Sequence, residues 1–551
     1  MPSGATRIVF LGGLGEVGRN MFVVETAGSL LVIDAGLSFP GDEALGVDLV
    51  LPDFGYVSER ARDCVGVVLT HGHEDHVGAL SWFLRDVDVP VYGTPLTLGL
   101  AGRRLAEFDV RADMTEIGSP ETREIGPFRC TFLAMSHSIP DAISVAIDTP
   151  DGRIFYTGDF KLDAAPIDGR KTDVATIEKL AAEGIDLLLS DSTNAEEQGH
   201  TPSESLVGDR LKEIFAGASR RIVAACFASN LHRIQQLCDA AEATGRRVAF
   251  VGRSMVANVE VGRDLGHLKV RDDTIVPLDD VDRLPPDRVV IVCTGSQGEP
   301  LSALSLIASG EHKAVSVTRG DTVVLSASPI PGNESAVHRV MNAFYKQGAD
   351  VYHSEADGVH VSGHAARDEL AEMLRLTKPR HFVPVHGEFR HLIAHSKIAR
   401  EVGIEEDHIT IVEDGDVIEL DDGRVRRCEK VRAGTVLVDG LGVGDVGPVV
   451  LRDRRLLAAD GFIVCVVTID SRTGELLAGP DLISRGFIFE DESQQFLDEA
   501  ADRVEDALAE LEKERVTDWA AIKKACRRAL GEFIWQETRR RPMIMPIVTE
   551  V

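Results

Sequence analysis

One short motif constrains the fold of this chain more than any other feature of its sequence. The apolar run at residues 65–69 leads directly into THGHEDH at residues 70–76. Three imidazoles and a carboxylate within six residues of a strand end cannot all reach one ion, so the spacing indicates two neighbouring metals. A solvated loop that happens to contain histidines would explain one of them, but it accounts poorly for all four. The ligands divide into His71 and His73 for one metal and Asp75 and His76 for the other.

Further residues of ligand type stand at the ends of other apolar runs. Asp34 closes a β-branched segment, His137 follows residues 132–135, Asp159 ends residues 155–158, and His386 follows residues 382–385. A lone aspartate after a strand usually forms a turn. Four such residues in this order are better explained as ligands that the folded chain gathers around the metals. Imidazole together with carboxylate favours zinc or manganese.

The pattern of predicted helices and strands changes several times along the chain, which predicts more than one domain. Short strands separated by Gly, Pro and Asp, with few helices, fill the first 160 residues. From about residue 203 helices alternate with strands, as in an α/β sheet. Histidine-rich sequence returns near residue 360. The last hundred residues contain a strand at 462–469, an amphipathic helix expected over 490–515 and a second helix at 519–535.

The order of these motifs resembles the metallo-β-lactamase superfamily. Asp191, His364 and His386 resemble the three motifs of its β-CASP nucleic-acid branch. Within that branch the sequence closely resembles the ribonuclease J family over essentially the whole chain, including FASNLHR at 227–233, CTGSQGEP at 293–300 and GPDLISRGF at 479–487. No ligand position departs from the family pattern.

The resemblance implies an α/β fold, namely a metallo-β-lactamase αββα sandwich with an inserted β-CASP α/β domain and a small C-terminal α+β domain. The expected boundaries are 1–202 for the first part of the sandwich, 203–359 for the β-CASP domain, 360–440 for the second part of the sandwich, 441–458 for a linker and 459–551 for the C-terminal domain.

The resemblance also implies a role for each site residue. One zinc or manganese ion is expected on His71, His73 and His137, and the other on Asp75, His76 and His386, with Asp159 bridging them and Asp34 orienting a ligand histidine. Asp191 and His364 resemble an acid/base pair, in which the donor is left open, and Asp75 is counted with them as catalytic.

Two further sites are implied by the family. Ser229, Asn230 and Leu231, together with residues His360, Val361, Ser362, Gly363 and His364, are expected to bind the 5′-monophosphate of a substrate. Ser229-Asn230 as an ordinary helix cap is the alternative. Gly46, Asp48 and Asp439 are expected to hold a structural calcium, although two unrelated loop aspartates would look the same.

The implied activity is two-metal hydrolysis of RNA, as a 5′-to-3′ exonuclease that is also an endonuclease, in mRNA decay and rRNA maturation. Expected partners are single-stranded RNA, a second copy in a homodimer or homotetramer, and an RNA degradation complex. The net charge of −30 argues against RNA taken alone, but metals and a few arginines can make one cleft positive. Alternatives are a small-molecule thioesterase or lactonase, or a non-catalytic RNA-binding subunit.

The sequence predicts a cytoplasmic protein without a membrane segment. Its eight cysteines are scattered and form no CxxC pair, which favours reduced, buried thiols over a disulfide framework. No apolar stretch is long enough to cross a bilayer, and the first residues do not resemble a signal peptide.

Overall fold

The structure is a computed structural model that describes residues 5–41, 43–330, 332–353, 357–487, 494–514 and 516–551. The chain divides into two compact units, one of residues 1–39 and 49–436 and the other of residues 40–48 and 437–551. Each unit is described by itself. Among the described residues no helix is both long and apolar enough to span a membrane.

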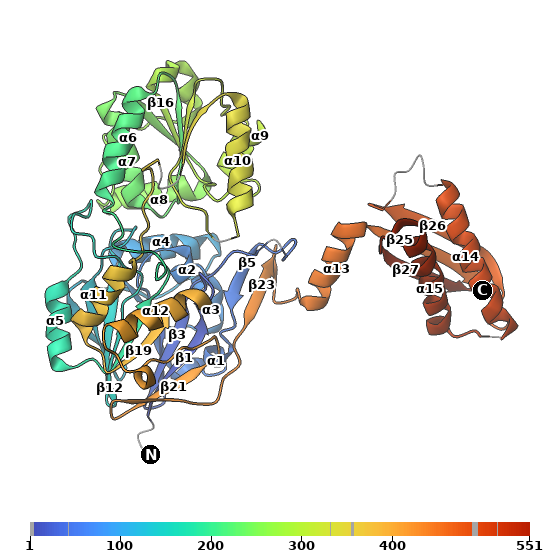
Figure 1. Ribbon diagram of the computed structural model, residues 1–551, viewed down its shortest axis with the longest axis horizontal. Coiled ribbons are helices and arrows are strands. Elements are labelled where there is room, and N and C mark those ends of the chain that lie inside the picture. The colour runs from blue at the N-terminus through green and yellow to red at the C-terminus, as the bar shows by residue number, and fades with distance from the viewer. Residues whose placement is uncertain (1–4, 42, 331, 354–356, 488–493, 515) are drawn as a thin grey trace. The chain divides into compact units, whose positions relative to one another are not determined.

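Two sheets form the centre of the first unit (Figure 1). The eight-stranded sheet has the order β22-β21-β1-β3-β4-β6-β7-β8, and the six-stranded sheet has the order β19-β13-β12-β11-β10-β9. The strands of the first sheet are β1 (Thr6–Gly12), β3 (Met21–Thr26), β4 (Ser29–Ile33), β6 (Cys64–Val68), β7 (Val91–Gly93), β8 (Met114–Glu116), β21 (Val417–Asp421) and β22 (Arg424–Arg427). Those of the second are β9 (Glu121–Ile125), β10 (Phe128–Ala134), β11 (Ile143–Thr149), β12 (Gly152–Tyr156), β13 (Leu187–Asp191) and β19 (His381–Val385).

The two sheets pack face to face because each strand turns alternate apolar residues to a shared core. Phe10 and Phe22 from the first sheet lie in one buried cluster with Phe128 and Phe132 from the second. The outer face of the first sheet is covered by α3 (Leu80–Asp86) and α4 (Pro95–Glu107), and that of the second by α5 (Val174–Glu183), α11 (Arg367–Thr377) and α12 (Phe389–Glu401). These four layers confirm the predicted αββα sandwich.

The first 160 residues contain more helix than the sequence predicts. The 13-residue helix α4 buries Leu96, Leu98, Leu100, Ala101 and Leu105. Its two glycines weaken the intrinsic helix propensity of the segment, so only packing makes the helical state favourable. The remaining short elements are α1 (Gly55–Ser58), α2 (Glu74–Val77), β2 (Leu14–Gly15), β5 (Leu49–Pro52) and β20 (Gly387–Glu388).

The inserted α/β part is a parallel five-stranded sheet with helices on both faces (Figure 1). Its order is β15-β16-β14-β17-β18, with β14 (Ile222–Ala225), β15 (Arg247–Val251), β16 (Val289–Cys293), β17 (Thr322–Leu325) and β18 (Asp350–His353). Helices α6 (Ser205–Gly217), α7 (Leu231–Ala243) and α8 (Arg253–Asp264) cover one face, and α9 (Ala303–Ser309) and α10 (Glu334–Gln347) cover the other. Strands buried on both faces read as continuous apolar runs, as the sequence shows here.

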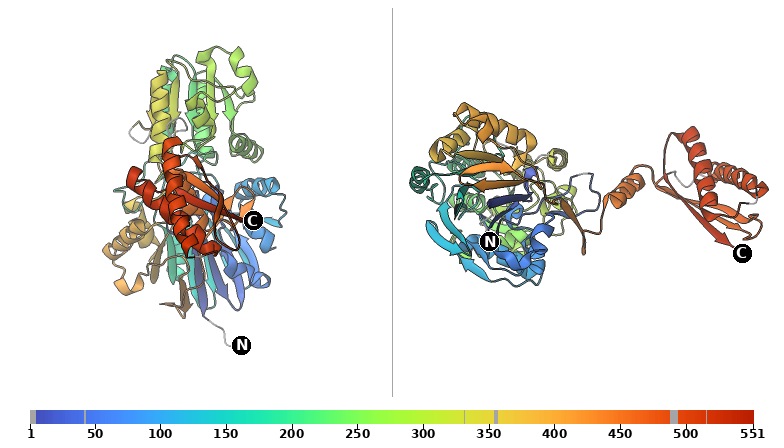
Figure 2. Two further views of the ribbon diagram at one scale, coloured as in Figure 1. Left: turned by 90° about the vertical axis from the view of Figure 1, so that its right-hand side faces the viewer. Right: turned by 90° about the horizontal axis from the view of Figure 1, so that it is seen from below.

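The second unit contains a three-stranded sheet, β26-β25-β27, with two helices on the same face (Figure 2). Its elements are β25 (Phe462–Ile469), β26 (Leu476–Arg485), α14 (Gln494–Lys513), α15 (Trp519–Thr538) and β27 (Met543–Glu550). The expected amphipathic face of α14 is confirmed, because Val504 and Leu508 are buried against the sheet. Residues 490–493 and 515 of the predicted helix lie outside the described residues. The expected linker at 441–458 contains most of α13 (Pro448–Asp460), and β23 (Thr435–Asp439) and β24 (Gly442–Val443) precede it.

Candidate metal centre

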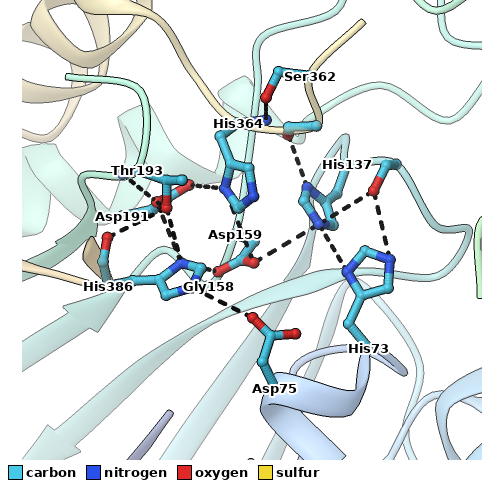
Figure 3. A network of polar contacts seen from close by, with 12 residues as sticks. His73, Asp75, His137, Gly158, Asp159, Asp191, Thr193, Ser362, His364 and His386 are labelled. Atoms are coloured by element: carbon cyan, nitrogen blue, oxygen red, sulfur yellow. Dashed lines mark hydrogen bonds and ion pairs between the residues drawn. The ribbon is translucent and has the colours of Figure 1, made fainter. Parts of the chain in front are cut away.

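The predicted ligands meet at one end of the two central sheets because of the way the strands are paired. Strand β13 lies parallel to both β12 and β19, so the residues that follow β12 and β19 emerge beside the end of β13. Asp159, Asp191 and His386 are therefore neighbours although they are far apart in sequence (Figure 3). The THGHEDH segment reaches the same place from the end of β6, and His137 reaches it from the end of β10.

Three imidazoles converge on the first group of donor atoms. His73 Nδ1 lies 3.1 Å from His71 Nε2 and 3.1 Å from His137 Nε2. Burial, together with neighbouring histidines, lowers the pKa of His71 and His137 well below its usual range. Burial also lowers the pKa of His73, to about 4. The three rings are therefore neutral at pH 7, and their converging nitrogens offer lone pairs, as a metal site requires.

The second group combines two histidines with two carboxylates. His76 Nε2 lies 3.2 Å from Asp159 Oδ2, and His386 Nε2 lies 3.4 Å from Asp75 Oδ2. Burial alone would lower the pKa of His76 and His386, but the surrounding carboxylates outweigh it and raise both pKa values well above the usual range. The same attraction to the two histidines outweighs burial at Asp75 and lowers its pKa. A divalent cation would supply the positive charge that this acidic group demands.

Asp159 belongs to both groups. The donors of His71, His73, His137 and Asp159 lie within 4.8 Å of one another, and so do those of Asp75, His76, Asp159 and His386. Each group thus fits one cation with imidazole and carboxylate ligands. The structure places all seven predicted metal ligands in these two groups, and the carboxylate that they share is the one predicted to bridge the ions.

Hydrogen bonds behind the ligands fix which ring nitrogen faces the centre. His76 Nδ1 donates to Asp34 Oδ2 at 2.8 Å, so Asp34 lies where the sequence predicted it, behind a ligand histidine. Asp34 also accepts hydrogen bonds from the backbone N–H and the hydroxyl of Thr70. His137 Nδ1 donates to the Gly363 carbonyl at 2.8 Å. Sequence reasoning missed Thr70 and Gly363 in this role. Thr70 could have been found, because it is the first residue of the THGHEDH motif.

Asp191 and His364 form a hydrogen-bonded pair beside the two groups (Figure 3). His364 Nδ1 donates to Asp191 Oδ2 at 2.8 Å, and Thr193 donates to Asp191 Oδ1 from its backbone N–H and its hydroxyl. The side chain of Asp191 is 1% exposed and that of His364 is 21% exposed. Asp191 therefore holds the ring, and the ring is the member of the pair that a substrate can reach. Thr193 was not predicted.

The predicted phosphate-binding residues separate into accessible and buried ones. Leu231 and Val361 are packed in the β-CASP core, so only their backbone can contact a ligand. Asn230 Oδ1 accepts from Arg233 N and caps α7, as the alternative interpretation proposed. Ser229 is half-buried, and its hydroxyl makes no hydrogen bond within the described residues.

His360 and Ser362 stand on the facing segment. The Nδ1 of His360 is buried and finds no hydrogen-bond partner among the described residues. Burial, with the charges of Arg233 and Lys161, lowers the pKa of His360 to about 3. The Ser362 hydroxyl accepts from Asn194 Nδ2 at 2.8 Å. Ser229 and His360 thus each have a polar atom without a hydrogen-bond partner among the described residues, and that of His360 is buried.

In the second unit, an arginine takes part in the predicted calcium site. The Arg454 guanidinium is paired with the Asp439 carboxylate and donates to the Leu45 carbonyl at 2.9 Å. A Cβ at Gly46 would lie 2.7 Å from Arg454 Nη1. Asp48 accepts from Gly440 N at 2.8 Å. A cationic side chain therefore occupies the carboxylate of Asp439, one of the residues predicted to bind calcium.

Family models cover most of the chain. Residues 14–210 match the metallo-β-lactamase superfamily, residues 219–344 the ribonuclease J β-CASP domain, residues 354–410 the Zn-dependent metallo-hydrolase RNA specificity domain, and residues 449–551 the ribonuclease J C-terminal domain. The exact domain boundaries predicted from the sequence stay predictions.

Curated relatives match over the full length. The chain is 44% identical to Ribonuclease J of Mycobacterium tuberculosis (strain CDC 1551 / Oshkosh), over 100% of this chain and 98% of the relative. It is 40% identical to Ribonuclease J2 of Bacillus subtilis (strain 168), over 99% of this chain and 98% of the relative.

A solved structure, titled as a protein of unknown function from Enterococcus faecalis V583, aligns with a TM-score of 0.52 and 14% identity, covering 77% of this chain and 100% of that one. This likeness concerns the fold alone. The domain matches and the full-length relatives together show that the chain belongs to the ribonuclease J family.

Proposed function

We propose that this member of the ribonuclease J family, a metal-dependent RNA-degrading nuclease, removes nucleotides from 5′-monophosphate ends in the 5′-to-3′ direction and also cuts RNA internally. The observation that carries the proposal is Asp159, which joins two groups of metal donors beside the accessible His364. A thioesterase or lactonase needs no inserted α/β domain. A non-catalytic subunit is disfavoured because every predicted ligand is present in the two groups.

The residues that would hold two zinc or manganese ions are His71, His73 and His137 for one, Asp75, His76 and His386 for the other, and Asp159 for both. Ions held there would supply a water of lowered pKa and would stabilise negative charge on phosphoryl oxygens. Asp34 and the Gly363 carbonyl orient two of the ligand rings from behind. Asp75 is a ligand in this proposal and contributes to catalysis only in that way.

His364 is the proton donor to the leaving oxygen in this proposal. Its Nδ1 is engaged by Asp191, so Nε2 is the nitrogen left for the substrate. Asp191 is almost fully buried and cannot reach an RNA strand itself. It holds the tautomer and the orientation of the ring, as carboxylates do behind catalytic histidines.

The terminal phosphate would be bound by Ser229 from one side and by residues 360–363 from the other. The Ser229 hydroxyl, which makes no hydrogen bond to the described residues, supports this assignment. Asn230 contributes by capping α7, and the N-terminus of that helix favours an anion. Binding of a terminal phosphate near His364 would fix which phosphodiester reaches the metals.

The 5′-end preference can be tested with three RNAs of one sequence, each labelled at the 3′ end, that carry a 5′-monophosphate, a 5′-triphosphate or a 5′-hydroxyl. We expect mononucleotide release from the monophosphate RNA to be at least about tenfold faster, because charge-assisted hydrogen bonds to the phosphate are lost in the hydroxyl RNA. A chelator should stop all three reactions. Equal turnover of the three ends, or comparable hydrolysis of a thioester or lactone, would contradict the proposal.

The structural calcium stays a prediction. In the second unit its binding would require displacement of the Arg454 guanidinium. Because Arg454 holds oxygens of Asp439 and Leu45, calcium must compete with a guanidinium. We expect Arg454→Ala to raise calcium affinity about tenfold, since a charge-assisted hydrogen bond contributes about 1.5–3 kcal/mol. Titration calorimetry with CaCl2 measures this, with Arg454→Ala/Asp48→Asn as the control. No gain in the single variant would refute calcium at these residues.

The assembly and the cellular role are also proposed from the family resemblance. They are self-association as a homodimer or homotetramer, a place in an RNA degradation complex, and roles in mRNA decay and rRNA maturation in the cytoplasm. Most of the cysteines are buried and all are free, which agrees with a reducing compartment.

A further inference from the structure

The segment 359–364, which links the phosphate-binding residues to His364, is held from behind by buried side chains. The Val359 carbonyl accepts from Arg233 Nη1 at 2.8 Å and from Ser326 Oγ at 2.6 Å. The Ser362 carbonyl accepts from Lys161 Nζ at 3.2 Å. Arg233 is 0% exposed and Lys161 is 1% exposed. Two cations inside the protein are thus used to bind the backbone of one short segment.

Nearby carboxylates partly compensate these two cations, although both charges still contribute to the lowered pKa of His360. Lys161 Nζ lies 3.7 Å from Asp163 and 3.9 Å from Glu204, and it also donates to the Pro202 carbonyl at 3.3 Å. Arg233 is paired with Glu204. A buried ion pair is weak evidence for stability, because well-packed apolar residues of similar size often serve a fold equally well. What Lys161 specifically provides is a donor for the Ser362 carbonyl.

Binding a carbonyl also orients the next N–H. In a trans peptide the C=O and the N–H point in opposite directions. With the carbonyls of Val359 and Ser362 turned to the buried donors, the N–H groups of His360 and Gly363 point away from them. Backbone N–H groups presented in this way bind phosphate oxygens.

The same segment contacts the metal centre directly. The Gly363 carbonyl accepts from His137 Nδ1, and a Cβ at Gly363 would lie 2.8 Å from the His137 ring. The His364 carbonyl has donors other than Lys161, namely Thr201 Oγ1 at 2.7 Å and Asn194 Nδ2 at 3.1 Å, the second of which also donates to the Ser362 hydroxyl. Loss of the Lys161 bond would therefore disturb Ser362 and Gly363 more than His364.

We propose that Lys161 is a positioning residue for recognition of the RNA 5′ end. By holding the Ser362 carbonyl it turns the Gly363 N–H toward the terminal phosphate and fixes that contact relative to His137 and His364. Ser326, together with Arg233, does the same for the His360 N–H at the other end of the segment. The inference rests on the proposed preference for 5′-monophosphate ends. It assigns that preference in part to residues that do not contact the RNA themselves.

The test is Lys161→Met in the whole chain, which keeps an unbranched side chain that is one atom shorter and removes the donor. We expect KM for the 5′-monophosphate RNA to rise about tenfold and kcat to change less than about twofold, because one charge-assisted contact is lost on binding. The preference for monophosphate over hydroxyl ends should fall by the same factor, while internal cleavage of the 5′-hydroxyl RNA stays within about twofold of wild type.

Two further variants keep this test decisive. Lys179→Met removes an exposed lysine of α5 and should leave the end preference unchanged. Should Lys161→Met fail to fold, Ser326→Ala serves in its place. It removes the hydroxyl that donates to the Val359 carbonyl, and it should also lower the preference for monophosphate ends.

Three results would overturn the inference. An unchanged end preference in folded Lys161→Met, or in Ser326→Ala, would do so. So would an equal loss of activity on monophosphate and hydroxyl RNAs together with loss of bound metal, because that pattern marks a purely structural role. A wild-type protein with no end preference would instead contradict the proposed function, and with it this inference.

Discussion

Asp159→Asn is expected to lose bound metal and to reduce RNA hydrolysis by at least about a thousandfold, which corresponds to about 4 kcal/mol of transition-state stabilisation. The reason is that Asp159 is the only residue common to the group with three histidines and the group with Asp75, His76 and His386, among the residues that the structure describes. A neutral amide at this position is a weaker ligand and leaves the histidines of the second group without their main counter-charge.

Metal content measured by atomic emission, together with cleavage of the 5′-monophosphate RNA, checks this expectation. Glu74→Gln is the matched control, because Glu74 is a carboxylate of the same motif that belongs to neither donor group. We expect the control to retain metal and activity. An Asp159→Asn protein with two bound ions and near wild-type rates would show that Asp159 does not bridge the groups.

His364→Ala is expected to retain the metals and to lower the single-turnover rate by about 10²–10⁴-fold, the usual contribution of a positioned general acid. His364 is absent from both of the donor groups joined by Asp159, although it also lies near Asp159, Asp191 and His386 in a third cluster. Asp191→Asn should lower the rate by a similar factor, because the His364 ring loses the carboxylate that orients it.

The leaving group distinguishes this role from a structural one. A substrate with a p-nitrophenolate leaving group needs no proton, so His364→Ala should lose far less activity on it than on RNA. His391→Ala, which removes a histidine outside these clusters, serves as the control. Equal losses on both substrates, or loss of metal from His364→Ala, would assign His364 to the metal centre instead.

The sequence by itself determined the type of fold and predicted the residues of the candidate metal centre. The THGHEDH motif, the four strand-end ligands and the change from strand-rich to helix–strand rhythm were all visible because strand ends and apolar runs are local features. Val504 and Leu508 on the buried face of α14 were visible for the same reason. Helix α4 was not visible in the sequence, because its two glycines lower the helix propensity of a segment that packing stabilises as a helix.

Only the tertiary structure decided which groups lie behind the ligands. The Gly363 carbonyl meets His137 across 226 residues of sequence, and Lys161 meets Ser362 across 201. Arg454 likewise reaches Asp439 only through the fold of the second unit. No periodicity predicts such contacts, because their partners are chosen by how strands and loops pack and by the need of every buried polar group for a hydrogen bond.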